Sequence, residues 1–112
     1  MNSINELIKK WQKKLKLTDW SIGYKFVVFH RKDNFPQKGD IKVNINKKSA
    51  TVLLLKDRKD YSNTILHELI HLLLWDYDSY TEKNISKDKK DKYFEKLEKT
   101  VASLTEIIWN SR

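Results

Sequence analysis

The chain of 112 residues contains no cysteine, a single proline and only two glycines. The absence of cysteine excludes disulfide bonds, cysteine-ligated zinc fingers, iron–sulfur clusters and thiol nucleophiles. The scarcity of glycine and proline excludes a collagen-like or flexible low-complexity chain and favours long regular elements. A length of 112 residues predicts one domain, residues 1–112, and 39% hydrophobic residues are enough to build one core.

Long apolar runs and arginine are also scarce. The longest apolar runs, 52–55 and 72–75, are too short to span a bilayer, and the charged N-terminus lacks the apolar core of a signal peptide. We therefore expect a cytoplasmic protein without membrane association. Lysine and arginine number 23 against 15 acidic residues, a formal net charge of +8, but only three of the 23 are arginine. A surplus made of lysine favours solubility and at most weak association with nucleic acid.

Hydrophobic periodicity predicts an α+β fold that begins with a helix. Ser3 and Glu6 form a capping-box pattern ahead of apolar residues at helical spacing, which predicts a helix that ends near Leu17. Residues 31–39 contain the only proline and predict a loop. Alternating patterns predict three strands, which we expect to form a mainly antiparallel sheet: 20–28, 41–46 and 50–55. The third strand is apolar enough to lie inside the sheet or along a covered face.

The second half of the chain predicts two helices joined by a polar loop. Residues 63–75 are apolar on nearly every side, which is typical of a buried helix. Residues 76–84 are polar and predict the loop. A last helix then starts at Ser86 and presents an apolar stripe, formed by Phe94, Leu97, Val101, Leu104 and Ile108.

The predicted buried helix contains the pattern H-E-x-x-H at residues 67–71. His67 and His71, four residues apart, lie on one side of a helix and can bind one tetrahedral metal ion. Glu68 lies about 100° around the helix from His67, beside that ion, where it can accept a proton from water. Three histidines and six glutamates placed at random give this pattern about 0.004 times in such a chain, so chance explains it poorly. The alternative is a pair of core histidines bonded to polar partners.

A catalytic zinc site requires a third protein ligand. The extended motif with a third histidine is excluded, because Leu74 and Tyr77 stand where it needs glycine and histidine. On the last helix, Glu98 lies about 80° from the centre of the apolar stripe, whereas Glu95 and Glu106 point more toward water. Glu98 is therefore the predicted third ligand. Other acidic residues stay open as alternatives: Asp78, Glu82 and Glu95.

The stretch 64–74, T-I-L-H-E-L-I-H-L-L-L, resembles the active-site helix of the zincin metallopeptidases. The order of elements is similar to that of small gluzincin-like domains of phage and mobile-element origin, with SprT-like and ImmA/IrrE-like peptidases as wider relatives. Residues 98–104 resemble the helix that carries their glutamate ligand. The resemblance implies a minimal zincin-like domain that binds Zn²⁺ through His67, His71 and Glu98 and hydrolyses a protein or peptide substrate, with Glu68 as general base. It also implies that an edge strand at 50–55 could pair with an extended substrate.

Two further points stay open in the sequence. Peptide hydrolysis is usually helped by a donor to the developing oxyanion, for which Tyr77, Tyr80 and His30 are candidates. The alternative function is a non-catalytic, zinc-stabilised basic module that binds nucleic acid or a protein partner. A combination, in which the basic surface delivers a peptidase to proteins bound to nucleic acid, is also compatible with the composition.

Overall fold

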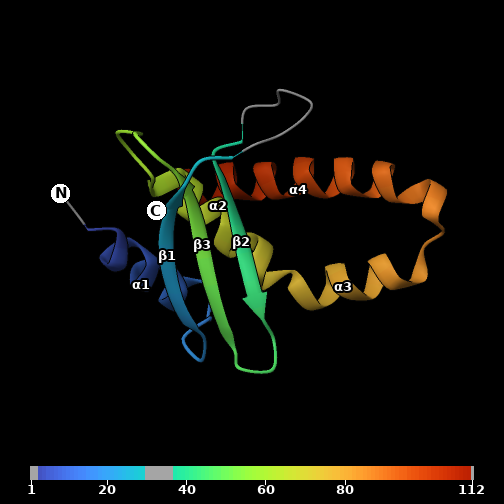
Figure 1. Cartoon of the computed structure of the whole chain (residues 1–112), viewed down its shortest axis with the longest axis horizontal. Coiled ribbons are helices and arrows are strands. Elements are labelled where there is room, and N and C mark those ends of the chain that lie inside the picture. The colour runs from blue at the N-terminus through green and yellow to red at the C-terminus, as the bar shows by residue number, and fades with distance from the viewer. Residues whose placement is uncertain (1–2, 30–36, 112) are drawn as a thin grey trace.

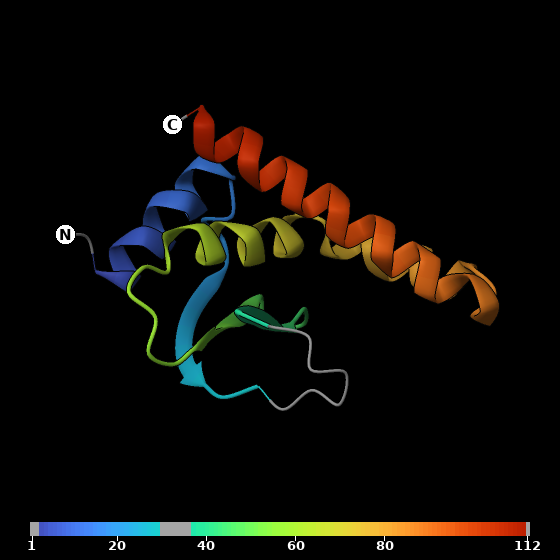
Figure 2. The ribbon, with the colours of Figure 1, turned by 90° about the horizontal axis from the view of Figure 1, so that it is seen from above.

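The computed structural model of the chain describes residues 3–29 and 37–111. These residues form an α+β fold, as predicted, with helices on one side of a small sheet (Figures 1 and 2). The helices are α1 (Ile4–Lys14), α2 (Ser62–Leu73), α3 (Trp75–Asn84) and α4 (Lys90–Asn110), and a 3-10 turn at Lys87–Lys89 precedes α4. The strands are β1 (Ser21–Val27), β2 (Gly39–Asn44) and β3 (Ser49–Leu55).

Helix α1 begins at the predicted capping box. The Ser3 hydroxyl accepts a 3.2 Å hydrogen bond from the Glu6 backbone N–H and donates to the Glu6 carboxylate. Ile8 and Trp11 are each 1% exposed and bury the apolar face of the helix in the core. The helix ends at Lys14, three residues before the expected end, and Lys16 has a left-handed backbone with φ of 59° that turns the chain toward β1.

The sheet is mixed, so the prediction of a mainly antiparallel sheet is wrong. The strand order is β1-β3-β2, with β1 parallel and β2 antiparallel to β3. Strands β2 and β3 are antiparallel because a tight turn joins them. In this turn the backbone N–H of Lys48 donates a 3.1 Å hydrogen bond to the Ile45 carbonyl oxygen. Strand β1 then pairs with the other edge of β3 and runs in the same direction.

The central place of β3 explains its apolar sequence, and the prediction that it lies inside the sheet is confirmed. Val52 and Leu54 are fully buried beneath the helices. Helix α2 packs against β2 and β3 on one side and against α4 on the other, and α1 lies beside it (Figure 2). Its residues Ile65, Leu66 and Leu69 are fully buried, so the predicted buried helix is confirmed as well.

Residues 76–84 form most of helix α3, so the prediction of a polar loop there is wrong. Helix α3 buries none of its residues, and hydrophobic periodicity therefore carries no signal for it. Asp76 and Asp78 lie in its first turn, where negative charge is favourable to a helix. Tyr93 of α4 donates a 2.6 Å hydrogen bond to Asp78, and this contact holds α3 against the first turns of α4.

In residues 3–29 and 37–111, no helix combines the length and the apolar character needed to cross a bilayer.

Candidate metal centre

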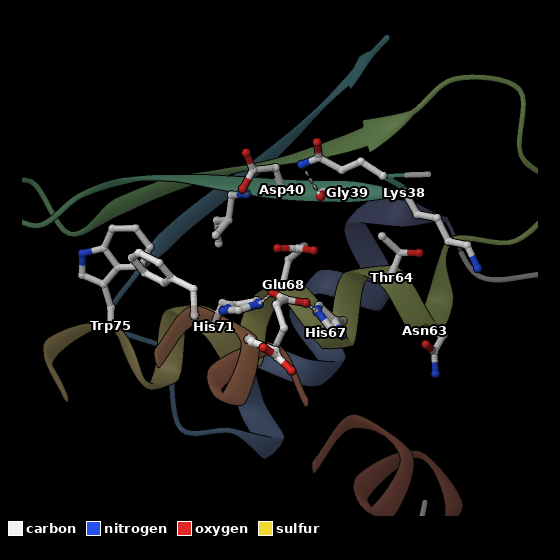
Figure 3. A pocket seen from close by; sticks show the side chains of 14 residues that line it. Lys38, Gly39, Asp40, Asn63, Thr64, His67, Glu68, His71 and Trp75 are labelled. Atoms are coloured by element: carbon white, nitrogen blue, oxygen red, sulfur yellow. Dashed lines mark hydrogen bonds and ion pairs between the residues drawn. The ribbon is translucent and has the colours of Figure 1, made fainter. Parts of the chain in front are cut away.

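Helix α2 presents different residues to its two neighbours. Successive residues of a helix are about 100° apart, so His67 and Glu68 cannot face the same neighbour. His67 and His71, one turn apart, face α4, whereas the Glu68 side chain points toward β2 (Figure 3). The apolar residues between the two histidines are buried and anchor the helix in the core. The motif therefore lies between β2 on one side of α2 and α4 on the other.

The structure brings His67, His71 and Glu98 together. The Nε2 atom of His71 lies 2.7 Å from Oε1 of Glu98, and Nε2 of His67 lies 3.4 Å from Oε2 of the same carboxylate. The two imidazole centroids are 5.1 Å apart. One ligand atom from each residue lies within 4.8 Å of the other two. The two rings thus converge on one carboxylate, 27 and 31 residues away in the sequence.

This donor set fits a zinc ion by its chemistry. Zinc prefers imidazole nitrogen and carboxylate oxygen at about 2.0–2.2 Å in a tetrahedral arrangement, which places neighbouring ligand atoms about 3.3 Å apart. The distance of 3.4 Å between His67 Nε2 and Glu98 Oε2 is close to that value, whereas His71 Nε2 and Glu98 Oε1 lie at a hydrogen-bond distance of 2.7 Å. Three protein ligands also leave a fourth position for water or substrate, as in catalytic zinc sites. The role of these residues as metal ligands stays a prediction.

The Glu98 carboxylate is strongly favoured in its ionised form. Its hydrogen bonds with His67 and His71 lower the pKa of Glu98 far below its ordinary value, against a smaller opposite effect of burial. The carboxylate itself lies at the surface of α4, with 61% of the side chain exposed. An ionised carboxylate is the form that binds a cation, so its surroundings suit the predicted ligand.

Glu68 lies in the opposite environment. The residue is 6% exposed and fits beneath β2. Desolvation raises the pKa of Glu68 to about 8, and the nearby charges of Asp40 and Glu98 act in the same direction, whereas His67 lowers it. A buried carboxyl with a raised pKa beside two imidazoles is typical of a group that exchanges protons. The role of Glu68 as a general base stays a prediction.

Gly39 allows β2 to lie close enough to α2 to cover Glu68. A Cβ atom at this position would lie 2.6 Å from Cγ2 of Thr64, 3.2 Å from the Leu53 carbonyl oxygen and 3.3 Å from Oε2 of Glu68. Contacts this short require the strand or the helix to move. The prediction of a loop at residues 31–39 is wrong at Gly39, which begins strand β2. A glycine at the start of a strand, where backbones approach closely, is the signal that could have revealed the role of Gly39.

A cavity of about 650 Å³ opens beside the histidine pair (Figure 3). Its size falls in the range of small-ligand sites, about 300–1,000 Å³. The β2 side contributes Gln37, Lys38, Gly39, Asp40 and Ile41, and the α2 side contributes Asn63, Thr64, His67, Glu68, His71 and the adjoining Trp75. Helix α4 completes the lining with Phe94, Glu95 and Glu98. The cluster is thus accessible to a molecule that enters between β2 and α4.

Among residues 3–29 and 37–111, strand β2 and not β3 forms the edge of the sheet at this cavity. The expectation of an edge strand at 50–55 is therefore wrong, because β3 is paired on both sides. The Lys38 carbonyl oxygen accepts a hydrogen bond from the Leu55 N–H of β3. In an antiparallel pair, successive residues direct their backbone N–H and C=O groups alternately toward the partner strand and away from it. Gly39 and Ile41 therefore direct their backbone groups to the open edge. Gln37 donates to the Gly39 carbonyl oxygen at 3.1 Å, and Asp40 Oδ1 accepts from the Ile41 N–H at 2.8 Å.

Several sequence candidates lie away from the cluster. Tyr77 and Tyr80, proposed as oxyanion donors, are 67% and 71% exposed on α3 and do not line the cavity. His30, the third candidate, lies outside the described residues. Asp78 accepts the hydrogen bond from Tyr93 instead of approaching the histidines. Glu95 lines the cavity but lies 3.5 Å from Lys99, with which it forms an exposed ion pair.

The lysines of α1 lie on its solvent-exposed face, as expected for an amphipathic helix. Lys9, Lys10, Lys13 and Lys14 are all exposed. Lys10 and Lys14 lie over the Trp11 ring, with Nζ atoms 5.2 and 5.4 Å from the ring centroid. Weak association of this surface with nucleic acid stays a prediction.

Comparison of the chain with protein-family models, with curated proteins and with solved structures found no match. The function of the chain is therefore inferred from its residues and their geometry.

Proposed function

We propose that this domain is a zinc-dependent peptidase in which His67, His71 and Glu98 bind the metal and Glu68 is the general base. The single observation that carries the proposal is the convergence of two imidazole nitrogens and one carboxylate beside a second, buried carboxyl. A structural zinc site is usually closed by four protein ligands, whereas three ligands leave one position open for water or substrate. The additional buried carboxyl favours a reaction over a structural role, because an isolated carboxyl is costly to bury.

Each residue has a distinct part in the reaction. Bound zinc would polarise a substrate carbonyl, acidify a water molecule and favour the ionised form of Glu68. Glu68 takes a proton from the water that attacks the peptide carbonyl and passes it to the leaving amide nitrogen. Burial beneath β2 shields the Glu68 carboxylate from bulk water and keeps it directed at the cavity.

The substrate lies along β2 in this proposal. An extended peptide can add to the open edge of a sheet and form backbone hydrogen bonds there. The Gly39 carbonyl and the Ile41 N–H point to this edge beside Glu68, and the Gln37 and Asp40 side chains bond to them. A substrate backbone would replace these two side-chain bonds with its own donor and acceptor.

The first test is metal analysis of the purified protein and its His67→Ala variant. We expect about one zinc ion per chain in the native protein, and loss of that zinc in the variant, because a three-ligand site would lose one ligand. A native protein that binds no zinc after incubation with the metal would contradict the proposal at its foundation.

The second test separates catalysis from metal binding. In Glu68→Gln, we expect cleavage of unfolded casein to fall by about 100–10,000-fold, the range attributed to general acid–base catalysis, while zinc content is unchanged. Glu106→Gln, an exposed position on α4, is the matched control. If Glu68→Gln cleaves casein as fast as the native protein, Glu68 is not the base. Salt-dependent DNA binding by a zinc-loaded protein that cleaves nothing would favour the non-catalytic module.

A further inference from the structure

The two ends of the cavity differ in character. At one end the lining consists of polar groups from β2 and the start of α2: Gln37, Lys38, Asn63 and Thr64. At the other end two aromatic side chains, Trp75 and Phe94, form the lining together with Ile41. The His67–His71–Glu98 cluster lies between the two ends. A ligand that fills this cavity therefore meets an apolar surface on one side of the cluster only.

The positions of the two aromatic residues follow from the register of the helices. Trp75 comes four residues after His71, and Phe94 comes four residues before Glu98. Helices α2 and α4 run in opposite directions (Figure 2), and His71 contacts Glu98 at 2.7 Å. Phe94 thus lies about one helical turn, or 5.4 Å along the α4 axis, from Glu98, and Trp75 lies just beyond the end of α2, on the His71 side of the cluster (Figure 3).

Helix α3 supports this aromatic end. The Tyr93 ring lies 5.5 Å from the Phe94 ring, and the Tyr93 hydroxyl bonds to Asp78 of α3. Trp75, the first residue of α3, packs against the core. Phe94, by contrast, is 38% exposed although it is a large apolar residue. An exposed phenylalanine that is held in place at the wall of a cavity is positioned to contact a ligand.

We propose that Trp75 and Phe94 form a specificity pocket for a bulky apolar side chain of the substrate, such as leucine or phenylalanine. An extended peptide advances about 3.3 Å per residue, so the selected side chain lies within two residues of the bond that is cleaved. The polar opposite end selects no such side chain. This inference rests on the proposed function, because it takes the metal cluster as the place of the reacting bond.

The test uses ligand binding, so that it does not depend on turnover. Two short peptide hydroxamates, identical except for a leucine or a glycine side chain next to the metal-binding group, are titrated by calorimetry into zinc-loaded Glu68→Gln protein. We expect the leucine ligand to bind about 10-fold more tightly, since partial burial of such a side chain is worth that much. In the double variant with Phe94→Ala, and in that with Trp75→Ala, this preference falls to about 2-fold or less.

A matched control is Ile107→Ala, which removes a 61% exposed apolar residue of α4 that does not line the cavity. If Trp75 and Phe94 form the pocket, we expect the Ile107→Ala variant to keep the 10-fold preference for the leucine ligand. Phe94 is exposed enough that its replacement leaves the fold intact, so the inference does not depend on the more buried Trp75. If the protein binds zinc but binds the leucine and glycine ligands with equal affinity, the specificity pocket is overturned and the proposed function is not. A preference that survives both aromatic replacements also overturns it, and a protein that binds no zinc overturns both proposals.

Discussion

Two carboxylates flank the same pair of imidazoles and lie in opposite surroundings. Glu68 is buried beneath β2, and burial raises its pKa to about 8. Glu98 lies at the surface of α4, and its hydrogen bonds with His67 and His71 lower its pKa far below the ordinary range. Two chemically similar groups are thus driven toward different protonation states by their environments.

The difference indicates a division of roles. A carboxylate that stays ionised and reaches both imidazoles is suited to bind a cation. A carboxyl with a raised pKa is suited to accept and release protons near neutral pH. The helix itself separates the two roles, since the α4 side of α2 carries the histidines and the β2 side carries Glu68.

The largest effect is expected on the α4 side. Glu98→Ala removes one of three predicted ligands, and we expect the dissociation constant for zinc to rise by at least about 100-fold, because zinc sites depend on every ligand. Competition with a chromophoric chelator measures this constant. Glu95→Ala, on the same helix and pairing with Lys99, is the control and changes zinc affinity less than about 3-fold. Equal effects of the two variants would show that Glu98 is not a ligand.

An intermediate effect is expected on the β2 side. In Gly39→Ala the added Cβ meets Thr64 at 2.6 Å, so β2 must move away from α2, and we expect the free energy of unfolding to fall by about 1–3 kcal/mol. Urea denaturation measures the change. Gly23→Ala is the matched control, because nothing lies within 4 Å of its Cβ, and stability should stay constant or rise by about 0.5–1 kcal/mol.

A second substitution sharpens this result. Thr64→Ala removes the Cγ2 atom that the new Cβ would meet. The double variant with Gly39→Ala should therefore recover part of the lost stability relative to the sum of the two single changes. Strict additivity would place the strain elsewhere and weaken the account of how β2 covers Glu68.

The smallest effect is expected at the open edge of β2. Asp40→Ala removes the acceptor of the Ile41 N–H, and we expect hydrogen exchange of that amide to accelerate about 5-fold, which corresponds to one hydrogen bond of about 1 kcal/mol. Exchange followed by NMR measures the rate. Asp40→Asn keeps an acceptor oxygen at the same position and serves as the control. An Ile41 amide that stays equally protected in Asp40→Ala must have another partner, and the edge would then differ from our description.

The sequence predicted α1, α2 and β3 from one property that they share, which is that they bury apolar residues. Helix α1 was predicted from its capping box and stripe, and α2 from its continuous apolar residues, because burial at fixed spacing leaves a pattern in the chain. Glu98 was selected from the acidic residues for the same reason, since its angle to the stripe of α4 placed it near the buried side. The structure brings Glu98 to the histidines and leaves Glu95 in an ion pair with Lys99.

The features that the sequence did not predict depend on partners distant in the chain. Helix α3 buries no residue and is held by contacts such as that of Tyr93 with Asp78, so its sequence resembles a polar loop. The mixed sheet arises because β1 pairs with β3 and not with its successor β2, a choice that local alternation does not encode. The role of Gly39 depends on Thr64 and Glu68, which lie 25 and 29 residues further along.

By itself the sequence determined the motif, its helix and the spacing of the two imidazoles, because these follow from 3.6 residues per turn and the burial of one helix. Only the tertiary structure decided which strand borders the cavity and which aromatic residues line it. The physical reason is that packing brings together α2, β2 and α4, and with them the opposite environments of Glu68 and Glu98. A pKa shift depends on burial and on neighbouring charges, and both are properties of the folded chain.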